Sequence, residues 1–409
     1  MEILGGGVRM KMKKLSEEKG VVLVLAILLL LVATLIGISS VNTANYDIRI
    51  SGNKRISEQA FYAAEAGINE FMGRFRDGAT DAITDDAASN PVESTPPWRL
   101  ILARDNTTAS KVASRLGISN YTFIQSLQTP LDFGVEVRHK VNIANNVIFY
   151  GGVPVYIVRS YGYTPEGGNK IIEVELNKIP NLDPPGALYS ERPINVQGSS
   201  THINGNDHCG TKNKPGIMTI LPETATDPVA VDEHGNPDIS GDPEIQYSTP
   251  NLPLKEEVEY LRKDANFTYY YNGNQTLTGY SDSWGIPTGS GTTNPLTYEG
   301  PINIVYFKMD GNSTLKLAGG SHGAGILLVD GNLELNGGFK WYGLIIVTGA
   351  LDYTGGGDKN VTGGIMTGES ATVSVDVGGN AGILYCSALE DKLKKVVSPF
   401  RIVRWREIF

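Results

Sequence analysis

The chain has 409 residues, of which 48 are glycine, and a formal net charge of −9. This length has room for two or three domains, and the acidic balance argues against nucleic acid as a partner. Only 19% of the residues are charged. The glycine excess, which falls mainly between residues 311 and 382, predicts a turn-rich β architecture.

An uncharged apolar segment runs from Val21 to Val41. About 21 residues at roughly 1.5 Å each cover about 32 Å, which is enough to cross the hydrocarbon core of a bilayer. Basic residues outnumber acidic ones in residues 1–20, so the positive-inside rule places this leader in the cytoplasm. The apolar core is longer than that of a cleaved secretory signal. The sequence therefore predicts a transmembrane helix over residues 21–41.

The helical pattern continues beyond the membrane segment. From Ile56 to Phe75, apolar residues recur at intervals of three and four, which is typical of one face of an amphipathic helix. We expect a single rod over residues 21–75, with helix breaks at Gly37 and at Gly52-Asn53.

Two features of this rod carry a family resemblance. The basic leader ends at Gly20, directly before the apolar segment, as in type IV prepilins. Farther along, the sequence reads Gly52-Asn53 and then Ala60-Phe61-Tyr62-Ala63-Ala64-Glu65-Ala66-Gly67. Together these residues resemble the N-terminal region of PilX-type minor pilins, over roughly residues 10 to 75.

The resemblance implies that a prepilin peptidase cuts between Gly20 and Val21. It also implies assembly with other major and minor pilins by the pilus assembly machinery. Most pilins carry a Glu five residues into the mature chain, where this chain has Leu25. In the family that Glu is thought to pair with the N-terminal amine of a neighbouring subunit. Leu25 fits a subunit at or near the fibre tip, although it could simply add hydrophobicity.

The sequence pattern after the rod changes twice, first to an acidic stretch and then to alternating apolar residues. Residues 77–97 are acidic and contain proline, which predicts a surface loop. From Phe133 to Leu176 the apolar period becomes two, with glycine pairs between the runs, which predicts three or four antiparallel strands. We expect an α+β, pilin-like domain over residues 76–180, in which an antiparallel β-meander packs on the long helix.

A repeat follows a proline-containing linker that ends at Gly186. Gly325-Ile-Leu-Leu-Val-Asp-Gly331 is echoed by Gly343-Leu-Ile-Ile-Val-Thr-Gly349. Short apolar runs with a glycine at each corner, at a period of about 18 to 21 residues, are typical of stacked β-solenoid rungs. We therefore predict a mainly β, solenoid-like domain over residues 187–409, interrupted by an insertion at about 209–300.

The end of the chain and the cysteines give two further expectations. Residues 400–409 are expected to form a strand that caps the last rung. Cys209 and Cys386 lie on the outward side of the membrane, where disulfides form. A bond between them would close a very long loop and stabilise the fold by about 4–5 kcal/mol in the chain-entropy model. The alternative is two separate buried thiols.

No motif points to chemistry. His202, His208 and Cys209 lie close in sequence, but their spacing matches no metal-ligand pattern, so we expect no metal and no cofactor. The acidic residues of the repeats, from Asp310 to Asp376, lie at turns or outward positions, which repeat geometry explains without catalysis. Aromatic residues around 269–284 could bind a surface ligand, although packing over the solenoid is favoured. We predict no enzyme activity.

These features predict a non-enzymatic minor pilin, tip-proximal in a type IV pilus, that displays a large β domain outward. Before assembly it would lie in the inner membrane with its N-terminus in the cytoplasm and its C-terminus in the periplasm, and afterwards at the cell surface. A type II secretion pseudopilin would use the same anchor. A membrane-anchored solenoid adhesin or glycan-binding protein is the third alternative, and a solenoid polysaccharide lyase or hydrolase has the least support.

Overall fold

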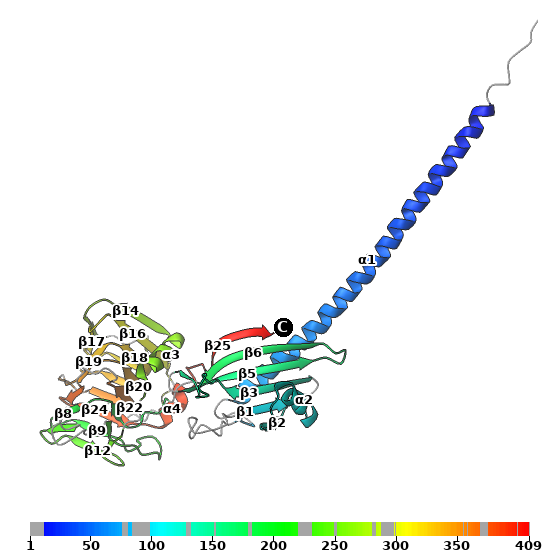
Figure 1. The fold of residues 1–409 in the computed structure, drawn as a ribbon. Coiled ribbons are helices and arrows are strands. Elements are labelled where there is room, and N and C mark those ends of the chain that lie inside the picture. The colour runs from blue at the N-terminus through cyan, green and yellow to red at the C-terminus, as the bar shows by residue number, and fades with distance from the viewer. Residues whose placement is uncertain are drawn as a thin grey trace, which may run out of the picture.

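The structure is a computed structural model with one long helix, an α+β unit around the end of that helix, and a β-solenoid (Figure 1). In the first helix, side chains are described from Val21 onward. The described residues are 12–75, 81–83, 99–127, 132–150, 153–178, 182–219, 231–248, 252–279, 284–287, 298, 300–354, 356–357, 359–368, 375–398 and 400–408. Most of the leader and most of the acidic loop expected at 77–97 lie outside these ranges.

The first helix, α1 (Met12–Arg74), runs for 63 residues without interruption. At a rise of about 1.5 Å per residue its length is about 95 Å. The breaks expected at Gly37 and Gly52 are absent, so that prediction was wrong. No atom lies within 4 Å of the position that a side chain would take at either glycine, so no packing contact deflects the helix there. Glycine alone weakens a helix by only about 1 kcal/mol.

The end of α1 packs on a sheet with the strand order β2-β1-β3-β5-β6-β25, in which β4 also pairs with β5. Strands β3, β5 and β6 form the predicted antiparallel meander. Helix α2 joins the parallel strands β1 and β2. The bounds are β1 (Arg99–Ala103), α2 (Asn106–Leu116), β2 (Thr122–Gln125), β3 (Asp132–His139), β4 (Phe149–Tyr150), β5 (Val153–Tyr163), β6 (Asn169–Lys178) and β25 (Phe400–Ile408).

The two helices cover opposite faces of this sheet. On one face, Ile68, Phe71 and Phe75 of α1 share a core with the inward residues of β3, β5 and β6, such as Val135 and Val174. On the other face, α2 packs through Ala109, Val112 and Ala113. The alternation of apolar and polar residues in the strands thus places one set of side chains under α1.

The solenoid is built from two parallel sheets. From β14 to β24 the strands alternate between these sheets along the chain, so that one turn contributes a strand to each sheet. The strands of the C-terminal turns are β14 (Phe267–Tyr271), β15 (Gln275–Thr278), β16 (Asn303–Met309), β17 (Thr314–Ala318), β18 (His322–Asp330), β19 (Asn332–Leu335), β20 (Lys340–Val347), β21 (Leu351–Tyr353), β22 (Lys359–Thr367), β23 (Val375–Gly378) and β24 (Ala381–Tyr385). The earlier strands are β7 (Leu188–Ser190), β8 (Ile194–Gln197), β9 (His202–Asn204), β10 (Ile217–Thr219), β11 (Val231–His234), β12 (Asp238–Ser240) and β13 (Ile245–Tyr247).

The turns do not stack in chain order. The first strands of the domain, β7 and β8, pair with β22 and β23 near the end of the chain, and β9 pairs with β24. Strands β10 to β13 continue the stack beyond them. The chain then crosses to the other end, where β14 and β15 pair with β16 and β17. The insertion predicted at about 209–300 was therefore wrong, because much of this segment supplies strands to both ends of the solenoid.

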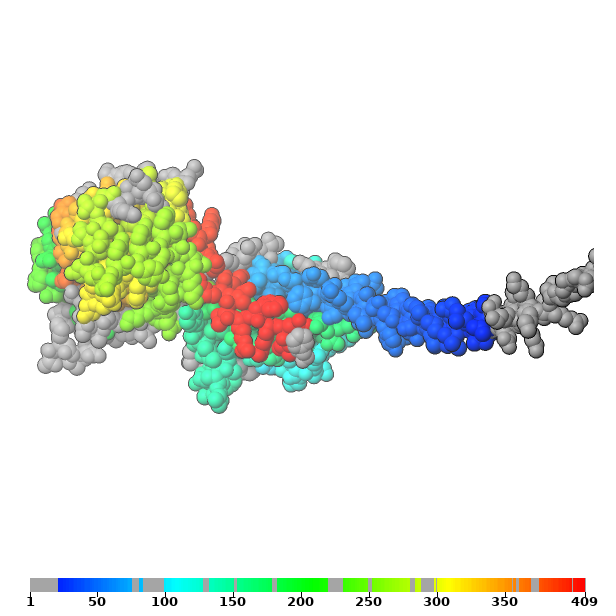
Figure 2. All heavy atoms as spheres, turned by 90° about the horizontal axis from the view of Figure 1, so that it is seen from above, coloured from blue at the N-terminus to red at the C-terminus, as the bar shows by residue number. Residues whose placement is uncertain are grey.

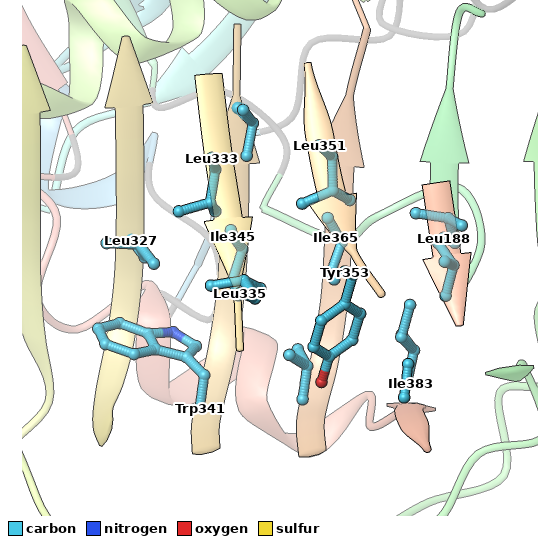
Figure 3. Close-up of a cluster of buried hydrophobic side chains, with 14 of the residues drawn as sticks. Leu188, Leu327, Leu333, Leu335, Trp341, Ile345, Leu351, Tyr353, Ile365 and Ile383 are labelled. Carbon is cyan, nitrogen blue, oxygen red and sulfur yellow. The ribbon is translucent and has the colours of Figure 1, made fainter. Parts of the chain in front are cut away.

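The solenoid core lies between the two sheets. Leu327, Ile345 and Ile365 of one sheet meet Leu333 and Leu351 of the other, as Figure 3 shows. A column of glycines at the rung corners permits this stacking, because Gly325, Gly343 and Gly363 lie side by side with positive φ. A Cβ at Gly343 would lie 2.8 Å from the carbonyl carbon of Gly325. The corner glycines of the repeat are thus steric requirements of the stack.

Two helices cover the outer face of the larger sheet, and the last strand leaves the solenoid. Helices α3 (Leu254–Leu261) and α4 (Ala388–Leu393) pack on outward residues such as Ile326 and Leu344. Strand β25 does not cap the last rung, contrary to the prediction. It pairs antiparallel with β6, in the sheet β2-β1-β3-β5-β6-β25 that packs on α1 and that we call the pilin-like sheet. Apolar residues alternate with arginines in this strand, which suits a sheet with an apolar face under α1 and a row of charged residues on the opposite face.

Candidate membrane anchor and assembly surface

The surface of the N-terminal part of α1 is exposed. Every residue from 21 to 50 is exposed, including Val21 at 66% and Leu25 at 60% of its surface. Figure 1 shows this part of α1 projecting away from both folded units. The helix is long and apolar enough to cross a membrane. An apolar surface of this extent needs either lipid or other apolar helices around it.

Two hydroxyl groups within the apolar segment are satisfied by the helix itself. Thr34 Oγ1 donates to the Leu31 carbonyl over 2.8 Å, and Ser40 Oγ donates to the Ile36 carbonyl over 2.8 Å. Because these hydroxyls need no water, they lower the cost of placing α1 in hydrocarbon.

Small residues of the motif from Ala60 to Gly67 bring α1 into close contact with the sheet. Ala60, Ala64 and Gly67 face β5 and are buried. A Cβ at Gly67 would lie 2.8 Å from Val135 Cγ2 and 2.9 Å from Phe133 Cδ2. The spacing of these small residues therefore sets how closely the helix approaches the sheet, which gives this part of the motif a packing role.

The other motif residues divide between contacts and exposure. Ala63 is buried, and Ala66 packs against the core from a half-buried position. The Phe61 ring meets the Trp405 ring edge-to-face with 6.1 Å between centroids. Glu65 and Asn53 are exposed. The structure thus brings residues 60–67 together with the sheet, whereas it gives Gly52-Asn53 no such contact.

A buried carboxylate that the sequence reasoning missed fixes the end of α1. Ser126 Oγ donates to Glu70 Oε2 over 2.6 Å, and the backbone N–H of Leu127 donates to Glu70 Oε1 over 2.8 Å. Arg74, one turn along, donates to the same carboxylate from Nη1 over 3.0 Å. The Glu70–Arg74 spacing of four was the available signal, because it marks a helical ion pair.

A row of alternating charges crosses the sheet face opposite α1. Glu136, Arg159, Glu173 and Arg406 occupy neighbouring register positions on β3, β5, β6 and β25. Arg159 Nε donates to Glu173 Oε2 over 2.5 Å. Burial would raise the pKa of Glu173, but the hydrogen bonds and charges of Arg159 and Arg406 hold it below its usual value. Burial raises the pKa of Glu136, against the opposing effect of nearby arginines.

Cys209 and Cys386 form a disulfide across a sequence separation of 177 residues, with 5.3 Å between their Cα atoms. They lie beside β9 and β24, where the first and last parts of the solenoid stack. Asp207 joins the same segments, because its carboxylate accepts hydrogen bonds from the N–H groups of Ser387 and Cys209. Burial would raise the pKa of Asp207, but the bonds from Ser387, Lys212 and Cys209 hold it below its usual value.

Most of the residues considered as metal ligands or catalytic groups have other partners in the fold. His202 contacts Asp238, and Cys209 is in the disulfide. Glu334, Asp352 and Asp376 line up on adjacent strands of the smaller sheet. Their partners are Lys316, Thr354 and Asn195, respectively. Within the described residues, no group of three or more histidine, cysteine or acidic side chains is placed to hold a metal ion.

The aromatic residues of the crossing segment are mostly packed. Trp284 is fully buried, and Tyr269 stacks on Phe307 with 4.8 Å between centroids. Tyr270 is exposed. The larger part of this group therefore belongs to the end of the solenoid core.

Comparison with known proteins assigns the N-terminal region. The PilX N-terminal family model matches residues 19–69, which include Gly20, Leu25 and the motif from Ala60 to Gly67. The crystal structure of the competence-associated pilin ComZ from Thermus thermophilus aligns with 86% of this chain and 97% of that chain, at 11% identity and a TM-score of 0.25. At that TM-score the alignment supports no conclusion about a shared fold. No curated protein matches this chain significantly. Residues 19–69 of this chain are thus a PilX N-terminal domain.

Proposed function

We propose that the chain is a non-enzymatic minor pilin, a structural subunit at or near the tip of a type IV pilus. The observation that carries this proposal is a PilX N-terminal domain whose apolar residues, from 21 to 50, are all exposed. Such a helix can exchange lipid for the helices of other pilins, because both surroundings are apolar. Its partners are then other major and minor pilins.

Processing would precede assembly. In this proposal, a prepilin peptidase cuts between Gly20 and Val21 at the cytoplasmic side of the inner membrane, and the assembly machinery then extracts the mature subunit into the fibre. The excess of basic residues in the leader supports a cytoplasmic N-terminus and a periplasmic C-terminus.

Two features support a position at the tip. Leu25 stands where most pilins carry a Glu, so this subunit offers no carboxylate there to the amine of a neighbour. The solenoid, with strands from residue 188 to 385, adds a second folded unit beyond the pilin-like sheet. Such bulk would crowd every layer of a fibre but is accommodated at its end.

N-terminal sequencing of the mature protein tests the processing step. We expect Val21 at the terminus, and we expect Gly20→Asp to leave the leader attached and keep the protein out of sheared pili. A mature terminus at Met1 or after Ser40, or normal assembly of the Gly20→Asp variant, would overturn the proposal.

Immunogold labelling with antibodies against the solenoid tests the position. Gold at the ends of pili supports a tip subunit, whereas regular gold along the fibre contradicts it. Labelling confined to the periplasm of cells that bear pili would instead favour a type II secretion pseudopilin. A mature protein that stays in the membrane in the presence of the complete pilus machinery would favour an anchored adhesin.

A further inference from the structure

The C-terminal segment connects the solenoid to the pilin-like sheet a second time. The chain passes from β6 to the solenoid through a linker, and it returns after β24 through α4 to β25. We call the return segment, residues 387–398 and 400–408, the strap. Figure 2 shows these residues, in red, between the solenoid and the unit that carries the helix.

The first part of the strap is attached firmly to the solenoid. Leu389, Leu393 and Val397 are buried, and the last two pack in the cluster that covers the outer face of the larger sheet. Lys392 Nζ donates to the Tyr298 carbonyl over 2.7 Å. Cys386, directly before the strap, is held by the disulfide. This part therefore moves with the solenoid.

The last part of the strap is attached equally firmly to the pilin-like sheet. Strand β25 pairs with β6 along its length. The Phe400 ring stacks on Phe75, at the end of α1, with 6.1 Å between centroids. Arg406 bonds the buried carboxylate of Glu173. This part therefore moves with α1.

Between these parts, the short helix η2 (Arg262–Asp264) and α3 meet the strap at a joint. Asp264 accepts hydrogen bonds from Ser398 N over 3.0 Å and from Ser398 Oγ over 3.1 Å. Arg401 Nη2 lies 3.5 Å from Asp264 Oδ2. The Arg401 guanidinium also lies over the ring of the fully buried Tyr260, 4.2 Å from its centroid. Tyr260 Oη in turn donates to the Asn177 carbonyl of β6 over 3.4 Å.

The contacts of the joint hold the two chain connections together. Phe400 at the start of β25 lies opposite Lys178 at the end of β6, so both connections leave the sheet at the same corner. A single connection would let the solenoid turn about one chain segment. Two connections tied by Tyr260 and Asp264 remove that freedom, because any rotation must break buried contacts of the strap.

We propose that the strap fixes the direction in which the solenoid is held relative to α1, with Asp264, Tyr260 and Arg401 as the positioning residues of the joint. The solenoid is then presented as a rigid extension of the membrane helix, so a partner meets it in one orientation. This inference concerns the geometry of the chain and holds whether or not the chain is a pilin.

Pulsed electron paramagnetic resonance on the full chain in lipid nanodiscs tests the strap. Spin labels carried by non-cysteine unnatural amino acids at the exposed positions 73 and 352 leave the native disulfide intact. We expect one narrow distance distribution for the parent. The double variant Asp264→Asn, Arg401→Gln should widen it at least twofold, since the ion pair and the cation–π contact of the joint are lost. Lys394→Gln is the matched control, because it breaks the Lys394–Glu390 pair on the strap without touching the joint.

A second variant keeps the test decisive. Deletion of residues 400–409 removes β25 and should widen the distance distribution further. Formation of the Cys209–Cys386 bond in this variant, measured by mass spectrometry, serves as the control that the solenoid is folded. If deletion prevents that bond from forming, the double variant alone decides. A distribution as narrow in the double variant as in the Lys394→Gln control would overturn the inference.

Discussion

Arg406 on the C-terminal strand donates a hydrogen bond from Nε to Oε1 of Glu173 on β6 over 2.8 Å. The Glu173 side chain is only 2% exposed, and Arg159 bonds its other oxygen. One buried carboxylate therefore joins the last residues of the chain to the centre of the pilin-like sheet. Loss of the carboxylate would leave the guanidinium groups of Arg159 and Arg406, whose side chains are 27% and 42% exposed, without this partner.

The first prediction concerns this carboxylate. Glu173→Gln should lower the free energy of unfolding by about 3 kcal/mol, because it leaves partly buried charges without their partner. Glu58→Gln, which removes an exposed helical pair with Lys54, should cost less than about 1 kcal/mol. Urea denaturation followed by circular dichroism measures both. Equal costs for the two variants would contradict the buried role of Glu173.

The same carboxylate predicts a pH dependence. The pKa of Glu173 is lower in the folded chain than its ordinary value of 4.5. Its contribution to stability is therefore complete above pH 4.5 and is lost as the pH falls through the lower, folded-state pKa. The parent should lose stability more steeply than Glu173→Gln over this acid range. Parallel slopes in unfolding titrations between pH 5 and pH 3 would show that the carboxylate makes no such contribution.

Substitutions at two glycines of α1 can distinguish the effect of side-chain packing on stability from the effect of helix propensity. At Gly67 a side chain would collide with Phe133, Val135 and Ser160, whereas at Gly73 no atom lies within 4 Å. Gly67→Val should therefore destabilise the pilin-like unit by about 3 kcal/mol or more, through overpacking. Gly73→Val should change stability by less than about 1 kcal/mol, because valine is a better helix former than glycine and meets nothing. Thermal unfolding of the two variants tests this difference.

The corner glycines allow a similar comparison in the solenoid. Gly343 and Gly320 both have positive φ, at 132° and 80°, but only Gly343 is crowded by the rung beside it. Gly320→Ala should cost about 1 kcal/mol through backbone strain alone. Gly343→Ala should cost at least about 2 kcal/mol more, because its Cβ would overlap the backbone of Gly325. If the two substitutions cost the same, close stacking at the corners does not explain the glycine column.

The disulfide should act as one unit. Cys386→Ser is expected to lower the free energy of unfolding by about 4 kcal/mol, since the bond closes a very long loop. Cys209→Ser should cost a similar amount. The double variant should add less than about 1 kcal/mol to either single variant, because one broken bond already frees the loop. Additive losses in denaturant titrations would mean that each cysteine contributes through its own packing instead.

The sequence alone predicted much of the local structure. The apolar run from Val21 to Val41 and the stripe to Phe75 predicted one rod, because helical periodicity depends only on neighbours along the chain. The alternating pattern before Leu176 predicted the meander. The motif from Ala60 to Gly67 indicated the PilX N-terminal domain, whose family model matches residues 19–69. The buried contacts of Glu70 with Ser126 were not foreseen. That carboxylate has an ordinary helical spacing, and only packing shows that it is buried.

The order in which the solenoid stacks could not be read from the repeat. Periodic glycines and apolar runs predict that rungs exist, but every rung offers the same backbone edge to its neighbours. Strand β8 could therefore pair with any rung of matching shape, and in the folded chain it pairs with β23, far along the sequence. The segment expected to be an insertion also supplies strands to the stack. Its apolar runs are so short that they do not stand out as rungs in the sequence.

What the sequence by itself determined is a helix long and apolar enough to cross a membrane, the PilX N-terminal domain, and the presence of a meander and of repeated rungs. The helix, the meander and the rungs follow from residue spacing within a short stretch of chain, and the PilX N-terminal domain follows from the family model that matches residues 19–69. Only the tertiary structure decided that β25 returns to β6 and that Cys209 lies beside Cys386. Both are choices among partners far apart in sequence, and these choices depend on which edges and which buried charges fold into reach of one another.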